Sequence, residues 1–180
     1  MLILASKSPR RQELLRLITN DFTVKSAEVD EALPEGIGPK EAVEYLSEIK
    51  AMPFKNNDDI VIGADTVVCI GNKILGKPQD IDDAHRMLSL LSGKVHSVFT
   101  GVTVFKGNKK TTFSVETKVK FFPLTKNEII DYISTKEPMD KAGAYGIQGK
   151  GALLVEKIEG DYFNVVGLPV SKLHRVLSDI

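Results

Sequence analysis

The chain has 180 residues, of which 42% are hydrophobic and 27% are charged, and its formal net charge at pH 7 is zero. These values are typical of one globular domain, residues 1–180, or of two lobes that share a core. No basic stripe is present, so an extended nucleic-acid surface lacks its electrostatic footprint. The single cysteine, Cys69, excludes disulfides within the chain and cysteine-cluster metal sites. No apolar run approaches membrane-spanning length and no targeting segment is apparent, so we expect a cytoplasmic protein.

The first residues combine a buried strand with a basic helix start. Leu2 to Ala5 is short and apolar, as in a strand buried on both faces, and Ser8-Pro9 is a typical helix start. Arg10 and Arg11 then lie where the helix macrodipole is already positive, which disfavours cations. The pattern favours an anion site, such as one for phosphate, and the alternative is a solvated basic turn.

Acidic and basic residues follow at the ends of the next two elements. Residues 22–29 alternate as in a strand and lead into Glu31, whose acidic segment is either a solvated turn or a site for Mg²⁺. Apolar residues at helical spacing from Ala42 to Ile49 predict a helix. Lys50, at its far end, either complements the helix dipole or binds phosphate.

Asp65 interrupts an apolar run that predicts a central strand over residues 60–70. A carboxylate in such a setting is costly unless it is paired, hydrogen-bonded or bound to a metal ion. It is therefore either a structural aspartate or a metal ligand or general base. Gly63 and Ala64 before it are expected to let a substrate approach closely.

The second half of the chain alternates strands and helices. A Gly71-Asn72 turn returns the chain to Lys77, which precedes a proline in an extended backbone suited to aiming an ammonium at a phosphate. A glycine-rich loop, residues 140–151, is typical of ligand binding but is not a P-loop, and its Gln148 is suited to reading a base edge or bridging the loop. The remaining expected elements are a helix over 84–91, strands over 95–105 and 111–122, a capping box at Thr125, a hairpin of strands 153–158 and 161–166, and a last helix from Pro169.

Several of these segments together resemble one family, the Maf (septum formation) proteins. The resemblance spans nearly the whole chain. It is carried by residues 4–15 (LASKSPRRQELL), 63–68 (GADTVV), 76–78 (GKP), 91–96 (LSGKVH), 100–102 (TGV), 140–151 and 164–169 (NVVGLP).

The resemblance implies an α/β fold with a mixed central sheet and flanking helices, in two lobes around a deep cleft, related to the inosine triphosphate pyrophosphatases and often dimeric. The implied reaction is Mg²⁺-dependent hydrolysis of dTTP and UTP, or of modified pyrimidine nucleotides, between the α and β phosphates. Asp65 is then the proton acceptor and a metal ligand with Glu31. Arg10, Thr66 and Gln148 match the positions associated with substrate choice, and Ser6, Arg11, Lys50 and Lys77 match positions around the phosphates.

Two other functions stay open at this level. The same pocket in a non-catalytic protein gives a nucleotide-sensing regulator of septum formation and cell division, and a third possibility is house-cleaning of modified purine nucleotides. Asp65 together with the cationic residues favours turnover over sensing, since binding alone does not require the acid.

Overall fold

The computed structural model describes residues 1–180 and contains a seven-stranded sheet with helices packed against it. The strand order is β2-β1-β3-β5-β6-β7, and β4 pairs with β3 outside this path. β1 is parallel to β2 and β3, whereas β4 and β7 are antiparallel to their partners. The predicted α/β class with a mixed central sheet is therefore confirmed. The strands are β1 (Leu2–Ala5), β2 (Thr23–Lys25), β3 (Ile60–Ile70), β4 (Lys73–Leu75), β5 (Val95–Lys106), β6 (Lys109–Phe121) and β7 (Val155–Glu159).

The helices belong to two compact units of the chain. Unit 1 comprises Met1–Thr66, Phe99–Val115 and Phe163–Ile180, and unit 2 comprises Val67–Val98 and Glu116–Tyr162. No helix is both long enough and apolar enough to cross a membrane. The α-helices are α1 (Pro9–Leu15), α2 (Pro39–Ala51), α3 (Ile81–Leu91), α4 (Lys126–Ser134), α5 (Tyr162–Val166) and α6 (Val170–Ser178). The 3₁₀ helices are η1 (Met52–Phe54), η2 (Glu137–Asp140), η3 (Ala142–Ala144) and η4 (Gly149–Leu154).

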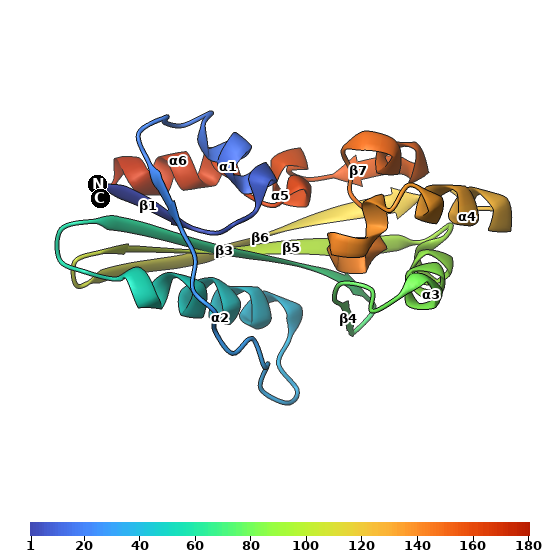
Figure 1. Cartoon of the computed structure of the whole chain (residues 1–180), viewed down its shortest axis with the longest axis horizontal. Coiled ribbons are helices and arrows are strands. Elements are labelled where there is room, and N and C mark those ends of the chain that lie inside the picture. The colour runs from blue at the N-terminus through green and yellow to red at the C-terminus, as the bar shows by residue number, and fades with distance from the viewer. The chain divides into compact units, whose positions relative to one another are not determined.

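In unit 1, α2 covers one face of the strands, and α1 and α6 lie on the other face (Figure 1). Two glycines allow α2 to approach closely. A Cβ atom at Gly63 of β3 would lie 2.1 Å from the carbonyl oxygen of Ser47, and one at Gly101 of β5 would lie 2.3 Å from that of Val43. Gly63 thus makes room for a helix backbone, and not for a substrate as its place before Asp65 suggested.

In unit 2, α3 packs against α4, and three aromatic rings of the same unit contact one another. His96, Phe121 and Tyr145 make edge-to-face contacts with centroids 4.7–5.3 Å apart. His96 is only 2% exposed, and its Nε2 atom is 2.6 Å from the Tyr145 hydroxyl. This agrees with a structural role for His96.

One predicted strand is shorter than expected and another is absent. The strand expected over residues 22–29 is limited to Thr23–Lys25. All three of its residues are exposed, so this strand has no apolar face packed against the core. Residues 162–166 form α5 and not the second strand of a hairpin. The reason is that Thr117 of β6 hydrogen-bonds through its Oγ1 atom to both the backbone N–H and the carbonyl of Asp161. These groups are therefore not available to a strand ladder.

Candidate functional site at the carboxyl end of β1

The site begins where β1 stops and β3 continues. Leu2 pairs with Ile60 and Leu4 with Ile62, and β1 ends at Ala5 while β3 runs on to Ile70. Asp65 therefore lies beyond the carboxyl end of β1, where ligands of open α/β sheets bind. Successive strand residues point to opposite faces, so Asp65 shares the face of α2 with Gly63, and Thr66 points to the face of α1.

On the α2 face, Lys50 joins two carboxylates. Its Nζ atom pairs with Oδ1 of Asp65 and lies 3.2 Å from Oε2 of Glu31. The Asp65 and Lys50 side chains are 12% and 19% exposed, whereas that of Glu31 is 55% exposed. Lys50 is in the last turn of α2, where the helix dipole also favours a cation. Both predicted metal-binding carboxylates thus converge on one positive charge.

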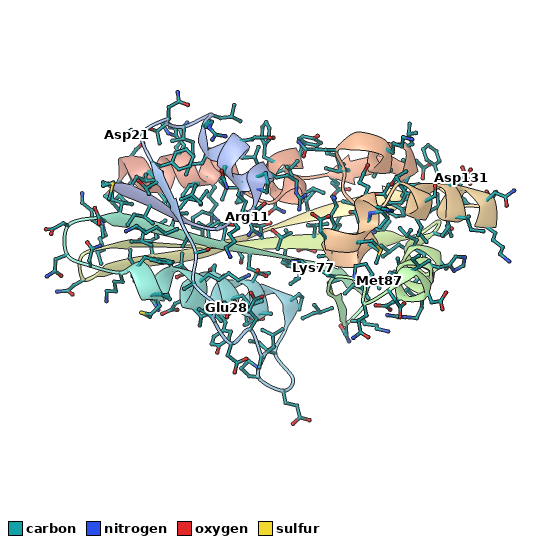
Figure 2. All side chains as sticks on the ribbon, viewed as in Figure 1. Arg11, Asp21, Glu28, Lys77, Met87 and Asp131 are labelled. Atoms are coloured by element: carbon teal, nitrogen blue, oxygen red, sulfur yellow. The ribbon has the colours of Figure 1, made fainter.

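On the α1 face, oxygen atoms from three segments orient Arg11. Its Nε donates to the carbonyl of Gly167 at 2.9 Å, Nη1 to Oγ of Ser6 at 3.4 Å, and Nη2 to Oγ1 of Thr66 at 3.1 Å. Figure 2 shows Arg11 extending from α1 toward the strands of unit 1. The helix start is as predicted, because the Ser8 side chain accepts from the backbone N–H of Arg11 and Pro9 occupies the first turn.

Burial and nearby charges act on the pKa of Arg11 in opposite directions. Burial lowers the pKa of Arg11 below its ordinary value. The charges of Asp65 and Glu31 oppose this shift, and the charge of neighbouring Arg10 adds to it.

Seven of the predicted site residues lie in unit 1. They are Ser6, Arg10, Arg11, Glu31, Lys50, Asp65 and Thr66. A region with both signs of charge suits a polyphosphate and a divalent cation.

The donor set fits a hard divalent cation. Mg²⁺ is commonly held by one or two carboxylates, with water and substrate phosphates as the remaining ligands. Glu31 and Asp65 already face a common cation, the Lys50 ammonium. No group of three or more candidate His, Cys, Asp or Glu ligands occurs in residues 1–180, so the protein alone does not provide a complete cage.

The sequence did not reveal the role of Thr100, which is completely buried on β5. Its Oγ1 atom lies 2.9 Å from Oγ1 of Thr66 and donates to the carbonyl oxygen of Asn164 at 2.9 Å. Residues 100–102 and 164–169 both belong to the segments that carry the family resemblance. Nothing in their composition, however, indicated that they meet behind Arg11.

Unit 2 holds the other two predicted residues, Lys77 and Gln148, which are both exposed. The backbone N–H of Gly143 donates to the carbonyl of Gly76 at 3.0 Å, which ties the segment before Lys77 to the glycine-rich loop. Glu137, at the start of η2 just before that loop, accepts from the N–H groups of Lys150 at 3.2 Å and Gly151 at 3.1 Å. These two N–H groups therefore serve the loop itself.

The fold and the charged region of unit 1 define an α/β protein with paired acidic and basic side chains beyond the end of a parallel strand. A family model for Maf-like proteins matches residues 1–180, and the chain belongs to this family.

Relatives with assigned activities match almost end to end. A dTTP/UTP pyrophosphatase of Bacillus pumilus is 54% identical over 178 residues, covering 98% of this chain and 94% of the relative. One of Thermosipho africanus is 55% identical over 178 residues, covering 99% and 92%. A solved structure, the Ham1 protein of Staphylococcus aureus, aligns with a TM-score of 0.46 and 13% identity over 67% of this chain and 71% of that one.

Proposed function

We propose that this chain hydrolyses dTTP and UTP between the α and β phosphates, releasing the nucleoside monophosphate and pyrophosphate. The observation that carries the proposal is the convergence of Asp65, Glu31 and Lys50 beyond the carboxyl end of β1, with Arg11 hydrogen-bonded to Thr66, the next residue of the same strand. The names of the full-length relatives support the same activity. Because phosphoryl transfer depends on positioning and charge stabilisation, a guanidinium fixed at Thr66 and a carboxylate pair that begins at the neighbouring Asp65 suit this chemistry.

Four residues of unit 1 have distinct roles in this proposal. Arg11 holds phosphate oxygens, with Ser6 fixing its guanidinium. Lys50, which pairs with Asp65 and Glu31, supplies a further positive charge for the phosphates. Asp65 accepts the proton of the attacking water, which requires an ionised carboxylate within reach of that water.

Mg²⁺ is the proposed cofactor, and Glu31 and Asp65 would hold it. When bound, the ion would neutralise phosphate charge and lower the barrier to attack on phosphorus. The two carboxylates supply oxygen ligands of the type that Mg²⁺ prefers, and the unfilled positions are left to water and substrate.

Substrate choice is assigned by family position. Arg10, Thr66 and Gln148 are the proposed selectivity residues, and Lys77 a further phosphate ligand. We also propose one Maf-like domain over residues 1–180, which the span of the family match supports. A homodimer, a cytoplasmic location and use of modified pyrimidine nucleotides stay predictions. The pyrophosphatase relatives do not favour the alternative of a non-catalytic regulator.

A pyrophosphate-release assay tests the proposal. The purified chain is incubated with each of dTTP, UTP, CTP, dATP and dGTP, with Mg²⁺ and with excess chelator. We expect pyrophosphate and the monophosphate from dTTP and UTP, and no turnover with chelator. Binding of dTTP without pyrophosphate release would instead identify a sensor, and a preference for purine substrates would refute the assigned selectivity.

A further inference from the structure

A chain of hydrogen bonds leads from Arg11 into the core of unit 1. Nη2 of Arg11 lies 3.1 Å from Oγ1 of Thr66, which lies 2.9 Å from Oγ1 of Thr100. Thr100 Oγ1 lies 2.9 Å from the carbonyl oxygen of Asn164 on α5. Thr100 and Asn164 are both 0% exposed, so the inner end of the chain is shielded from solvent.

Chemistry determines the direction of every proton in this chain. The Asn164 carbonyl carries no proton, so the contact at 2.9 Å requires Thr100 to donate its only hydroxyl proton there. Thr100 must then accept from Thr66 at their own 2.9 Å contact. A guanidinium only donates, and Thr66 accordingly accepts from Arg11.

Because its proton is committed to Thr100, the Thr66 hydroxyl has no proton to offer a phosphate oxygen. The donation to Thr100 instead orients the Thr66 hydroxyl so that a lone pair of its Oγ1 atom points at Arg11. Hydrogen bonds in such chains strengthen one another in a low-dielectric interior. We infer that Thr100 is a positioning residue that acts through Thr66 to aim the Arg11 guanidinium at the substrate phosphates. This inference rests on the proposed function of Arg11 as a phosphate ligand.

The test compares Thr100→Val with Thr100→Ser and with a matched control, Thr117→Val. Valine has the shape of threonine without the hydroxyl, and serine retains the hydroxyl. Thr117 is also 0% exposed and also donates to a backbone carbonyl, that of Asp161 at 2.9 Å, but it lies in unit 2 outside the Arg11 chain. The measurements are Tm, KM and kcat for dTTP with Mg²⁺, and the Kd of dUTP with an imido group between the α and β phosphorus atoms.

We expect both valine variants to lower Tm, because each leaves a carbonyl, buried for Asn164 and part-buried for Asp161, without its hydroxyl donor. Only Thr100→Val should raise KM and the analogue Kd, by about 10-fold for one misdirected charge-assisted hydrogen bond, with a much smaller change in kcat. Thr100→Ser should have a KM for dTTP and a Kd for the analogue close to those of the wild-type chain. The double variant Thr66→Val/Thr100→Val should be no weaker than Thr66→Val alone, since the two side chains act in series.

Equal KM and Kd in Thr100→Val and Thr117→Val would overturn the inference, as would full additivity of the two valine substitutions. Binding of the analogue by the wild-type chain without pyrophosphate release from dTTP would overturn the proposed function but leave the binding comparison as a valid test. A wild-type chain that does not bind the analogue would overturn both.

Discussion

Replacement of Asp65 by Asn separates the proton-accepting role of this residue from its place in the fold. Asparagine retains the size and one oxygen of aspartate, so the strand should be unaffected. Lys50 loses its partner on Asp65 but keeps Glu31, whose Oε2 is 3.2 Å from its Nζ. Because the Asp65 and Lys50 side chains are 12% and 19% exposed, the free energy of unfolding should fall by about 1–2 kcal/mol, between the values for exposed and buried pairs.

The catalytic loss should be far larger than the loss of stability. A positioned general base contributes about 10²–10⁴-fold to a rate, and a lost metal ligand adds to this. We expect Asp65→Asn to bind dUTP analogues with a Kd near that of wild type, while kcat for pyrophosphate release from dTTP falls at least 100-fold.

A suitable control is Asp59→Asn, because Asp59 also lies in unit 1 and pairs with a cation, the N-terminal ammonium of Met1, at 3.1 Å. Thermal unfolding should show a loss of stability for both variants, and only Asp65→Asn should lose turnover. A normal kcat in a folded Asp65→Asn protein would refute the proposal that Asp65 of β3 accepts the proton of the attacking water.

Three further outcomes are expected. Gln148→Glu should lower kcat/KM for dTTP and UTP relative to other nucleotides in a substrate panel, and unchanged ratios would show that Gln148 does not contribute to selectivity. Gly63→Ala should destabilise the fold by about 2–3 kcal/mol in urea unfolding, as overpacked cores do, because the added Cβ would lie 2.1 Å from the Ser47 carbonyl oxygen; a neutral effect would mean that α2 can shift. Burial lowers the pKa of His96 from 6.5 to about 4. Below pH 6.5 the unfolded chain therefore binds a proton that the folded chain does not. The free energy of unfolding should fall by about 3 kcal/mol between pH 7 and pH 4. His96→Gln should reduce this dependence when urea midpoints at pH 7 and pH 4.5 are compared, and equal pH dependence would assign the effect to other groups.

Local sequence signals predicted the elements that carry the site. The apolar run around Asp65 gave β3, the Ser8-Pro9 pair gave the start of α1, and Thr125 with Glu128 gave the capping box of α4. The two helix-start predictions succeeded because the responsible contacts lie within four residues of one another, and the β3 prediction succeeded because a bounded apolar run is typical of a buried strand. The expected strand over 161–166 failed because Thr117, more than forty residues away, bonds both backbone groups of Asp161.

Long-range contacts also decided how the charged residues are used. The sequence placed Arg11 at a helix N-terminus, where cations are disfavoured, but only the fold shows acceptors from Ser6, Thr66 and Gly167 around its guanidinium. It placed Lys50 at a helix end, and only the fold shows the two carboxylates that it joins.

By itself, then, the sequence determined which elements form and which residue types they present, since helix caps, strand patterns and turns depend on neighbours along the chain. The tertiary structure alone decided which groups meet, because Arg11, Thr66, Thr100 and Asn164 come from four separate elements. The pairing register of β1 and β3 places Asp65 and Thr66 beyond the end of β1, on opposite faces of β3. A register of this kind is a property of two segments together, which no local pattern in either one specifies.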